Sequence, residues 1–100
     1  MSEAPEDPAD GDAPADDPGV AVVPEGWEVH DGALEREWRF PDFPRAWAFM
    51  SRVALLAERM DHHPEWRNVH GRVRIRLTTH DAGGLTRRDV DMATEISTYA

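Results

Sequence analysis

The sequence predicts an α+β fold, in which a four-stranded antiparallel sheet carries helices on one face in the order β-β-α-β-β-α. Two stretches of alternating apolar and polar residues, each interrupted by a two-residue turn signal, predict the strands. Apolar residues spaced three and four apart after a good capping residue predict the helices, and they do so at two places in the chain.

The first hairpin is expected around Asp31-Gly32, which is among the strongest short turn signals. Residues 27–30 and 34–40 alternate with a period of two on either side of it. Leu34, Trp38 and Phe40 then share one face of the second strand, because alternate residues of a strand point the same way.

An amphipathic helix of about 17 residues is expected next, between Asp42 and Asp61. Asp42 suits the N-cap and Pro44 suits the first turn. The helix must end near Asp61, because Pro64 disfavours the helical conformation at His63. The residues at helical spacing, expected on one face, are Phe43, Ala46, Trp47, Met50, Val53, Ala54, Ala57 and Met60.

A second hairpin is expected around His70-Gly71, since residues 66–79 would be too long as a single strand. A two-residue turn there pairs residue i with residue 141 − i. Trp66 then lies opposite Ile75 and Glu65 opposite Arg76, so that apolar side chains share one face and charges match on the other.

The last helix is expected to begin at Thr86, with Asp89 completing a weakened form of the capping box. Val90, Ala93 and Ile96 then face inward. No internal repeat is visible in the sequence.

The charge of the chain is unevenly distributed. Residues 1–24 hold seven of the 20 acidic residues, five of the eight prolines and no basic residue. We predict a disordered acidic tail over residues 1–24, because its few apolar groups cannot offset the entropy of ordering it. It is most simply a solubilising extension, and an arm for a protein partner is the alternative. Residues 25–100 are predicted to form the single domain.

Composition excludes several classes of function. A net charge of −9 argues against nucleic-acid binding, and the absence of Cys and Lys excludes thiol nucleophiles, disulfides and lysine Schiff bases. No run approaches the ~18 apolar residues of a membrane helix and the start does not resemble a signal peptide, so we expect a cytoplasmic protein without membrane contact. Four Trp, three Phe and four Met are more than so small a domain can bury, which predicts a homo-oligomer.

Three of the five histidines are predicted to meet at one end of the second hairpin. The pairing rule sets three residues before the hairpin opposite three after it: Asp61, His62 and His63 opposite His80, Thr79 and Thr78. Cross-strand neighbours lie ~5 Å apart, which suits a ligand of one or two fused rings. An unperturbed imidazole titrates near pH ~6.5 and can donate or accept a proton near neutrality. We therefore predict an acid–base site.

Other interpretations of these residues stay open. The cluster depends on an inferred register, so a chance meeting at a helix-to-strand junction is one alternative. A zinc site is weaker, because the adjacent His62 and His63 point to opposite faces of an extended backbone and His80 would miss one of them; we expect no metal. His30 and His70 are assigned to the surface. Trp66 is assigned to the core, and it also forms a stacking platform if its edge reaches the pocket.

Several blocks of sequence around these histidines carry a resemblance that covers residues 26–97. They are Ala57-Glu58-Arg59-Met60-Asp61-His62-His63-Pro64-Glu65-Trp66, Asn68, Thr78-Thr79-His80-Asp81, Gly84-Leu85-Thr86 and Arg88-Asp89. In these blocks the chain resembles the pterin-4a-carbinolamine dehydratases, also called 4a-hydroxytetrahydrobiopterin dehydratases.

The resemblance implies dehydration of a 4a-hydroxytetrahydropterin to the quinonoid dihydropterin, the pterin-recycling step after an aromatic amino acid hydroxylase, with no cofactor beyond the pterin substrate. It implies that His62, His63 and His80 are the catalytic imidazoles, with Glu58 and Asp89 as supporting carboxylates. We assign the proton transfers to His62 and His80 and mainly binding to His63. The expected lining of the pterin pocket is Asp61, His62, His63, Trp66, Thr78, Thr79, His80 and Asp81.

The sequence also departs from that family. Members usually begin with a helix before the Gly-Trp strand, and here the Pro-rich residues 1–24 take its place, so that helix is expected to be absent. His70 replaces an expected aromatic residue, and Asp81 stands where Glu is common. The family forms dimers and tetramers, and some members act as dimerisation cofactors for a transcription factor. A non-catalytic interaction module of the same fold is therefore the alternative function.

Overall fold

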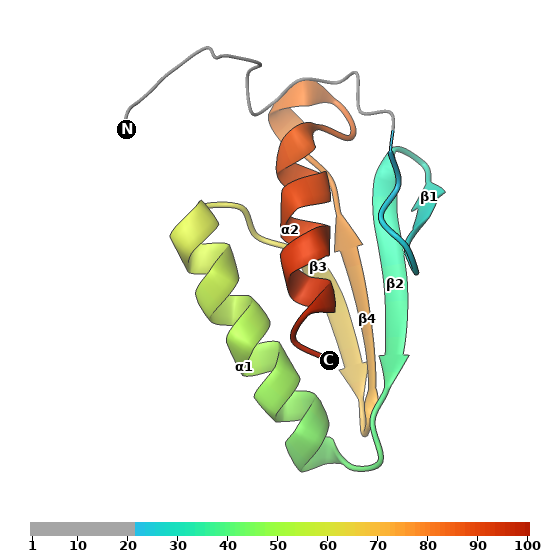
Figure 1. Cartoon of the computed structure of the whole chain (residues 1–100), viewed down its shortest axis with the longest axis vertical. Coiled ribbons are helices and arrows are strands. Elements are labelled where there is room, and N and C mark those ends of the chain that lie inside the picture. Colours follow the sequence, from blue (N-terminus) through green and yellow to red (C-terminus); the bar gives the residue numbers. More distant parts are fainter. Residues whose placement is uncertain (1–21) are drawn as a thin grey trace.

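The structure is a computed structural model that describes residues 22–100, so the predicted tail lies, as far as residue 21, outside the described residues. The elements are β1 (Glu28–His30), β2 (Ala33–Arg39), α1 (Phe43–Met60), β3 (Glu65–Val69), β4 (Arg72–Leu77), a short 3-10 helix η1 (His80–Ala82) and α2 (Arg87–Ser97). Figure 1 shows both α-helices on one side of the sheet. The predicted α+β class and the order β-β-α-β-β-α are confirmed.

The four strands form one antiparallel sheet in the order β1-β2-β4-β3. Both predicted turns are present, with Asp31, Gly32 and His70 in the left-handed backbone region. Gly71 is needed for a different reason: a Cβ there would lie 2.2 Å from the carbonyl oxygen of Phe40, whose own N–H donates to the Gly71 carbonyl at 2.7 Å. The turn of the second hairpin is thereby fixed against the end of β2.

The predicted register of the second hairpin is confirmed from Val69↔Arg72 to Trp66↔Ile75 and Glu65↔Arg76. The ladder ends there, so the expected cross-strand pairing of residues 61–63 with residues 78–80 is wrong. On one side the helix continues to Met60 and Pro64 has no N–H to donate. On the other side Thr79 exchanges backbone hydrogen bonds with Gly84, and His80 begins η1.

Helix α1 begins and ends as predicted. The Asp42 side chain accepts a hydrogen bond from the N–H of Arg45 at 3.0 Å, and Asp61 ends the helix in the left-handed conformation. The expected buried face is partly wrong, because Phe43, Trp47 and Ala54 are exposed. Compared with the predicted face, the buried face is rotated around the helix axis toward α2, because α1 packs against α2 as well as against the sheet. It consists of Ala46, Phe49, Met50, Val53, Leu56 and Ala57.

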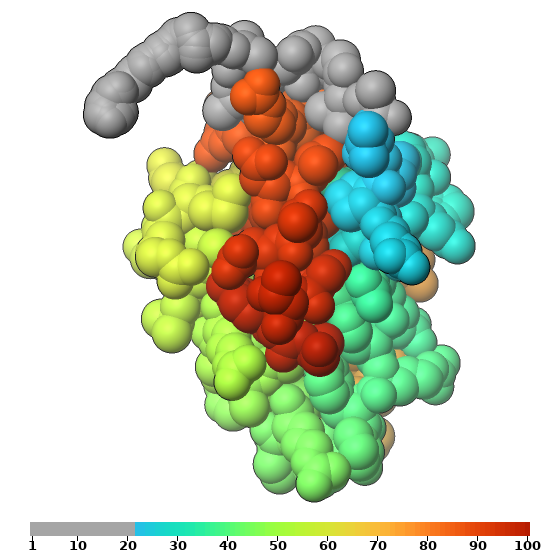
Figure 2. Space-filling model, viewed as in Figure 1, coloured from blue at the N-terminus to red at the C-terminus, as the bar shows by residue number. Residues whose placement is uncertain are grey.

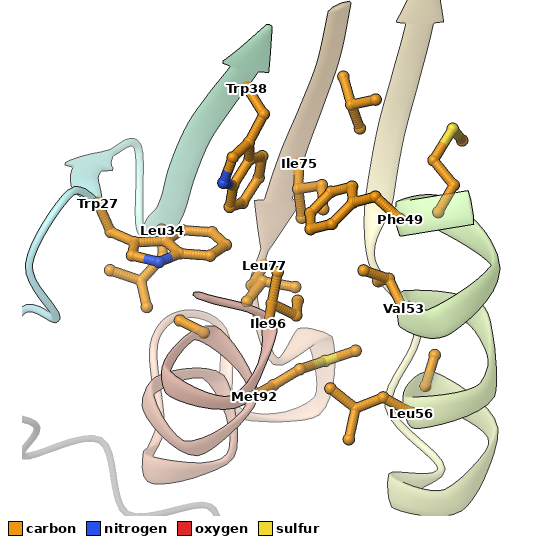
Figure 3. Close-up of a cluster of buried hydrophobic side chains, with 14 of the residues drawn as sticks. Trp27, Leu34, Trp38, Phe49, Val53, Leu56, Ile75, Leu77, Met92 and Ile96 are labelled. Carbon is orange, nitrogen blue, oxygen red and sulfur yellow. The ribbon is translucent and has the colours of Figure 1, made fainter. Parts of the chain in front are cut away.

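The core lies between the helices and the sheet (Figure 3). Ile75 points from β4 toward Phe49 of α1, and the ring centroids of Trp38 and Phe49 lie 4.8 Å apart, whereas Leu34 lies beside Trp27 and Leu77 beside Ile96 of α2. Burying a side chain of this size stabilises the fold by roughly 1.5–3 kcal/mol. The core therefore holds both hairpins and both helices in one unit.

Helix α2 lies across the middle of the helical face, between α1 and the first hairpin (Figure 2). Its predicted inward residues Ala93 and Ile96 are fully buried, Val90 is half-buried against the core, and Met92 is buried as well. The predicted capping box of Thr86 and Asp89 is present. Neither this helix nor any other within residues 22–100 is long and apolar enough to cross a membrane.

Candidate active site

A surface hollow of about 250 Å³ lies where the end of α1 meets the end of β4 and the start of α2. It has three of the five imidazoles of the chain on its wall. The residues that line it are Asp61, His62, His63, Thr78, Thr79, His80, Asp81 and Arg88. Seven of these eight residues belong to the site predicted from the sequence.

The end of α1 sends two neighbouring histidines in different directions. Asp61 adopts φ 51° and ψ 46°, and its N–H reaches back to the last turn of the helix, as does the N–H of His62, which donates to the Ala57 carbonyl at 3.1 Å. His62 is thereby turned inward, with 7% of its side chain exposed, whereas His63 is 63% exposed. The two rings therefore lie in different environments.

His62 forms a buried pair with Asp89, the first acidic residue of α2. Its Nε2 lies 2.6 Å from Asp89 Oδ1, and Asp89 is fully buried. The other carboxylate oxygen accepts hydrogen bonds from the Thr79 hydroxyl at 2.8 Å and from the Thr86 N–H at 3.0 Å. A buried carboxylate is tolerated when it has such donors, so this network keeps Asp89 in place behind the imidazole.

The donor and the acceptor of each hydrogen bond in this network can be assigned, because a carboxylate only accepts and a hydroxyl group has a single proton to donate. Thr79 donates to Asp89, so the Thr86 hydroxyl, 2.8 Å from the Thr79 oxygen, donates to Thr79. A carboxylate that only accepts requires the His62 proton on Nε2. In neutral His62 the other nitrogen, Nδ1, then carries a free lone pair that can accept a proton.

The other two imidazoles also face carboxylates, but in solvent. His63 Nε2 lies 3.3 Å from Glu58 Oε1, and His80 Nε2 lies 3.7 Å from Glu65 Oε2. The side chains of His80 and Glu58 are 79% and 82% exposed, so water screens these pairs and they hold the rings weakly. Each histidine of the hollow thus has its own carboxylate, and only one of the three pairs is buried.

Two threonines connect the hollow to the rest of the fold. The Thr78 hydroxyl donates to the Gly32 carbonyl in the turn of the first hairpin at 2.9 Å. Thr79 and Gly84 exchange two backbone hydrogen bonds and close the loop that carries His80 and Asp81. The loop is therefore anchored on both sides.

Two further predicted residues lie outside the lining. Asp89 lies behind His62, and Glu58 contacts the exposed edge of His63. Each of these carboxylates therefore contacts a histidine that lines the hollow. Trp66 does not line the hollow: it is half-buried and packs against the core. Among residues 22–100, no group of three or more His, Asp or Glu side chains is placed to hold a metal ion.

The sequence interpretation missed two residues of this region. Arg88 lines the hollow, and its Nη2 donates to the Asp61 carbonyl at 2.8 Å, holding the end of α1 against the start of α2. Glu65, expected only as a partner of Arg76, also faces His80. The signal for Arg88 was its place beside Asp89 in the first turn of the last helix.

Fold and site together define an α+β protein with a histidine-lined hollow backed by a buried carboxylate. The family described as pterin 4 alpha carbinolamine dehydratase matches residues 17–99 of the chain. The chain belongs to this family. The match begins within the segment predicted as the tail.

Two relatives illustrate the similarity, and both carry the name "Putative pterin-4-alpha-carbinolamine dehydratase". The protein from Synechococcus sp. is 60% identical over 70 residues, which is 70% of this chain and 75% of the relative. The protein from Rhizorhabdus wittichii is 60% identical over 76 residues, which is 74% of this chain and 78% of the relative.

Two solved structures share the fold. The transcriptional coactivator/pterin dehydratase from Brucella melitensis is 42% identical with a TM-score of 0.74, over 76% of this chain and 83% of that one. A pterin dehydratase-like protein described as a RuBisCO assembly factor in the alpha-carboxysome has a TM-score of 0.64 over 85% of this chain and 95% of that one. At 17% identity, the second similarity concerns the fold alone.

Proposed function

We propose that the protein dehydrates a 4a-hydroxytetrahydropterin to the quinonoid dihydropterin, as part of pterin recycling of the tetrahydrobiopterin type. Family membership supports the reaction class. The observation that carries the proposal is the 2.6 Å hydrogen bond between His62 and the buried Asp89, because it leaves Nδ1 of His62 as a proton acceptor beside two further imidazoles.

The reaction breaks the bond between C4a and the hydroxyl oxygen, and it breaks the N–H bond of the neighbouring ring nitrogen. The oxygen leaves as water once it has received a proton, and the electron pair of the N–H bond forms the new C=N double bond. One proton is supplied and one is removed, so nothing is oxidised or reduced and no cofactor beyond the pterin is needed.

We assign removal of the ring N–H proton to Nδ1 of His62. The imidazolium that forms is stabilised by the Asp89 carboxylate at the other nitrogen. We assign delivery of the proton to the leaving hydroxyl to His80 in its protonated form. Its exposure of 79% lets it recover a proton from water after each turnover.

His63 is assigned mainly to binding. It is exposed at the rim of the hollow, where its ring can contact a planar ligand while Glu58 holds its Nε2. Asp61, Thr78 and Asp81 offer polar atoms on the same wall, and Arg88 keeps Asp61 in position. A pterin ring, with donors and acceptors along its edge, suits such a wall.

The test is an assay in which a hydroxylase generates the 4a-carbinolamine and ultraviolet absorbance follows its decay. Wild-type protein should accelerate the decay, and His80→Ala and His62→Gln should lower turnover by ~10²-fold or more, as expected for a general acid or base. Glutamine keeps a donor for Asp89 and removes the proton acceptor.

His30→Ala is the matched control, because His30 is also exposed and also pairs with a carboxylate, Glu28, at 3.0 Å, but lies outside the hollow. It should retain full turnover. Decay at the spontaneous rate with wild-type protein would overturn the dehydratase. Wild-type rates in both His80→Ala and His62→Gln would overturn the assignment of the proton transfers.

The second candidate is a non-catalytic interaction module. Its support is that the fold also occurs in proteins described as a transcriptional coactivator/pterin dehydratase and as a RuBisCO assembly factor. Removing residues 1–21, which carry all seven acidic residues of the predicted tail, separates the two candidates. An acidic arm for a protein partner is required for pull-down of that partner and dispensable for turnover.

We further propose that the protein is a homo-oligomer. Phe43 and Trp47 stack with ring centroids 6.0 Å apart on the outer face of α1, where they are 48% and 55% exposed, and Leu55 on the same helix is 65% exposed. Water contact of such large apolar groups favours association. Light scattering should report a mass of at least two chains, and Trp47→Glu should reduce it; a wild-type monomer would contradict the proposal.

A further inference from the structure

The face of the sheet opposite the helices carries five of the eleven arginines of the chain. Alternation along β4 buries Val73, Ile75 and Leu77 in the core and turns every second residue outward. The helices cover only the core side (Figure 1). The outward arginines, which we call the arginine face, are Arg39, Arg67, Arg72, Arg74 and Arg76.

One end of the arginine face is neutralised by glutamates. Glu35 lies 2.6 Å from Arg74 and 3.2 Å from Arg76, and Arg76 also reaches Glu65 at 3.3 Å. Burial alone would raise the pKa of Glu35, but the hydrogen bond and charge of Arg74, with smaller contributions from His30 and Arg76, lower it below its ordinary value. The carboxylate is therefore ionised and balances these arginines.

The other end keeps its positive charge. Arg67 lies directly opposite Arg74, and Arg39 lies directly opposite Arg72. Like charges at such cross-strand positions destabilise a sheet. Among residues 22–100, Arg39 pairs with Glu37 at 2.9 Å, whereas neither Arg67 nor Arg72 has an acidic partner. A hollow of about 190 Å³ lies between these side chains, and its lining is Glu37, Arg67, Val69, Arg72 and Arg74.

Repulsion between arginines is relieved when an anionic ligand covers them. Arg67 and Arg72 lie diagonally on neighbouring strands, so carboxylates spaced along one extended acidic segment can reach both. The same chain contains such a ligand: seven acidic residues and no basic residue within residues 1–24. The charge that the arginine face lacks is thus present on the same molecule.

We propose that the acidic segment, residues 1–21, binds the arginine face of its own chain around Arg67 and Arg72. The geometry allows it, because 21 residues extend up to ~70 Å, several times the ~20 Å length of strand β4. Attachment to the domain replaces a bimolecular encounter by an intramolecular one, which raises the local concentration of the segment. The bound segment shields the arginine face from other polyanions.

The absence of cysteine makes a direct test simple. A single Ala9→Cys substitution carries a nitroxide label on the acidic segment of the full chain, and its effect on backbone amide signals is measured by NMR. At about 20 mM salt the amides of residues 67–74 should broaden, whereas those of Ser51, Arg52 and Leu55 on the outer face of α1 should not. At about 0.5 M salt the broadening should disappear, because exposed charges are then screened within a few Å.

The charge-reversed variant Arg67→Glu/Arg72→Glu should abolish the broadening. Arg45→Glu/Arg52→Glu, with the same change of charge on exposed positions of α1, is the matched control and should leave it unchanged. Asp10→Asn/Asp12→Asn/Asp16→Asn/Asp17→Asn weakens the interaction from the segment side without touching the domain. It should therefore reduce the broadening in a fully folded protein.

Three results would overturn the proposal. The first is no broadening at low salt, and the second is equal broadening over the arginine face and α1. The third is broadening that appears only between labelled and isotope-enriched molecules of a mixed sample, which would place the acidic segment on a second copy. None of these results bears on the dehydratase activity, so this proposal and the proposed function fail independently.

Discussion

The hollow has two walls, and each carries histidine side chains paired with carboxylates. The pair on one wall is buried, and the pairs on the other wall are exposed to solvent. On the buried wall His62 meets Asp89 at 2.6 Å, with side chains 7% and 0% exposed. On the exposed wall His63 meets Glu58 at 3.3 Å and His80 meets Glu65 at 3.7 Å, and all four side chains are more than half exposed. Burial, more than the choice of residues, separates the two walls.

This difference in burial gives the imidazoles different chemical properties. A buried carboxylate with three donors fixes the orientation and the protonated nitrogen of His62, which suits a base that must act at one atom of the substrate. An exposed imidazole exchanges its proton freely with water, which suits an acid that must be reprotonated. The proposed roles follow this difference, with His62 as the fixed base and His80 as the exchanging acid.

The largest expected effect is on the buried wall. Asp89→Ala removes the N3 member of the capping box and leaves His62, Thr79 and the Thr86 N–H without their buried acceptor. At about 1–3 kcal/mol for each unsatisfied group, this should lower the free energy of unfolding by ~3–5 kcal/mol. Glu58→Ala, the matched change on the exposed wall, should lower it by no more than about 0.5 kcal/mol. Urea unfolding of both variants measures the contrast, and equal losses would contradict the distinction between the walls.

A smaller effect is expected from the threonine behind the buried pair. Thr79→Val keeps the shape of a side chain that is 3% exposed but removes one donor to Asp89 and the acceptor of the Thr86 hydroxyl, which should lower the free energy of unfolding by ~1–3 kcal/mol. Thr78→Val, which removes a hydrogen bond in a more exposed place, should have less effect. The kcat should fall in Thr79→Val only, and a wild-type kcat in Thr79→Val would show that the network is structural alone.

The exposed wall provides a kinetic prediction. His63→Gln should raise the KM for the carbinolamine several-fold and leave kcat within about two-fold, because a binding group contributes equally to ground state and transition state. Steady-state kinetics over a range of carbinolamine concentrations separates the two constants. A fall in kcat as large as that of His62→Gln would place His63 among the catalytic residues and remove the proposed division of roles.

The smallest effect concerns acid stability at the edge of the exposed wall, where Arg76 joins Glu65 to Glu35. Because the pKa of Glu35 is lowered in the folded protein, its contribution to stability is present above the ordinary value of 4.5 and is lost as the pH falls through the folded value. Glu35→Gln should therefore be less stable than wild type at pH 7, and the difference should shrink in acid. A difference in thermal midpoint that is the same at both pH values would contradict this.

The order of the elements and the turns could be predicted from local sequence signals. Local signals fail for features that depend on tertiary contacts, such as which face of a helix is buried. Asp31-Gly32 and His70-Gly71 specify their turns by backbone conformation, so the register from Val69↔Arg72 to Glu65↔Arg76 follows from the sequence. The buried face of α1 does not, because Phe43 and Trp47 have the same helical spacing as the buried residues. Which apolar stripe faces inward depends on the position of α2.

Seven of the eight residues that line the hollow could be predicted from the sequence, whereas the geometry that brings them together could not. Extending the hairpin ladder placed His62 opposite Thr79, whereas the structure places their side chains around Asp89 through a helix end and a closed loop. The pairing of His62 with Asp89 joins residues 27 positions apart, and no local pattern encodes it. Arg88 was missed for the same reason, since its contact with the Asp61 carbonyl depends on how the two helices meet.

The most direct test of the buried His62–Asp89 pair is the position of the proton on the His62 ring. Two-bond nitrogen–proton correlation NMR on the full-length protein distinguishes the tautomers of neutral imidazoles. Neutral His62 should carry its proton on Nε2, with an unprotonated Nδ1. In Asp89→Asn, where no carboxylate faces Nε2, His62 should no longer hold its proton on that nitrogen. His62 protonated on Nδ1, or averaged between both nitrogens, would contradict the role of the buried carboxylate.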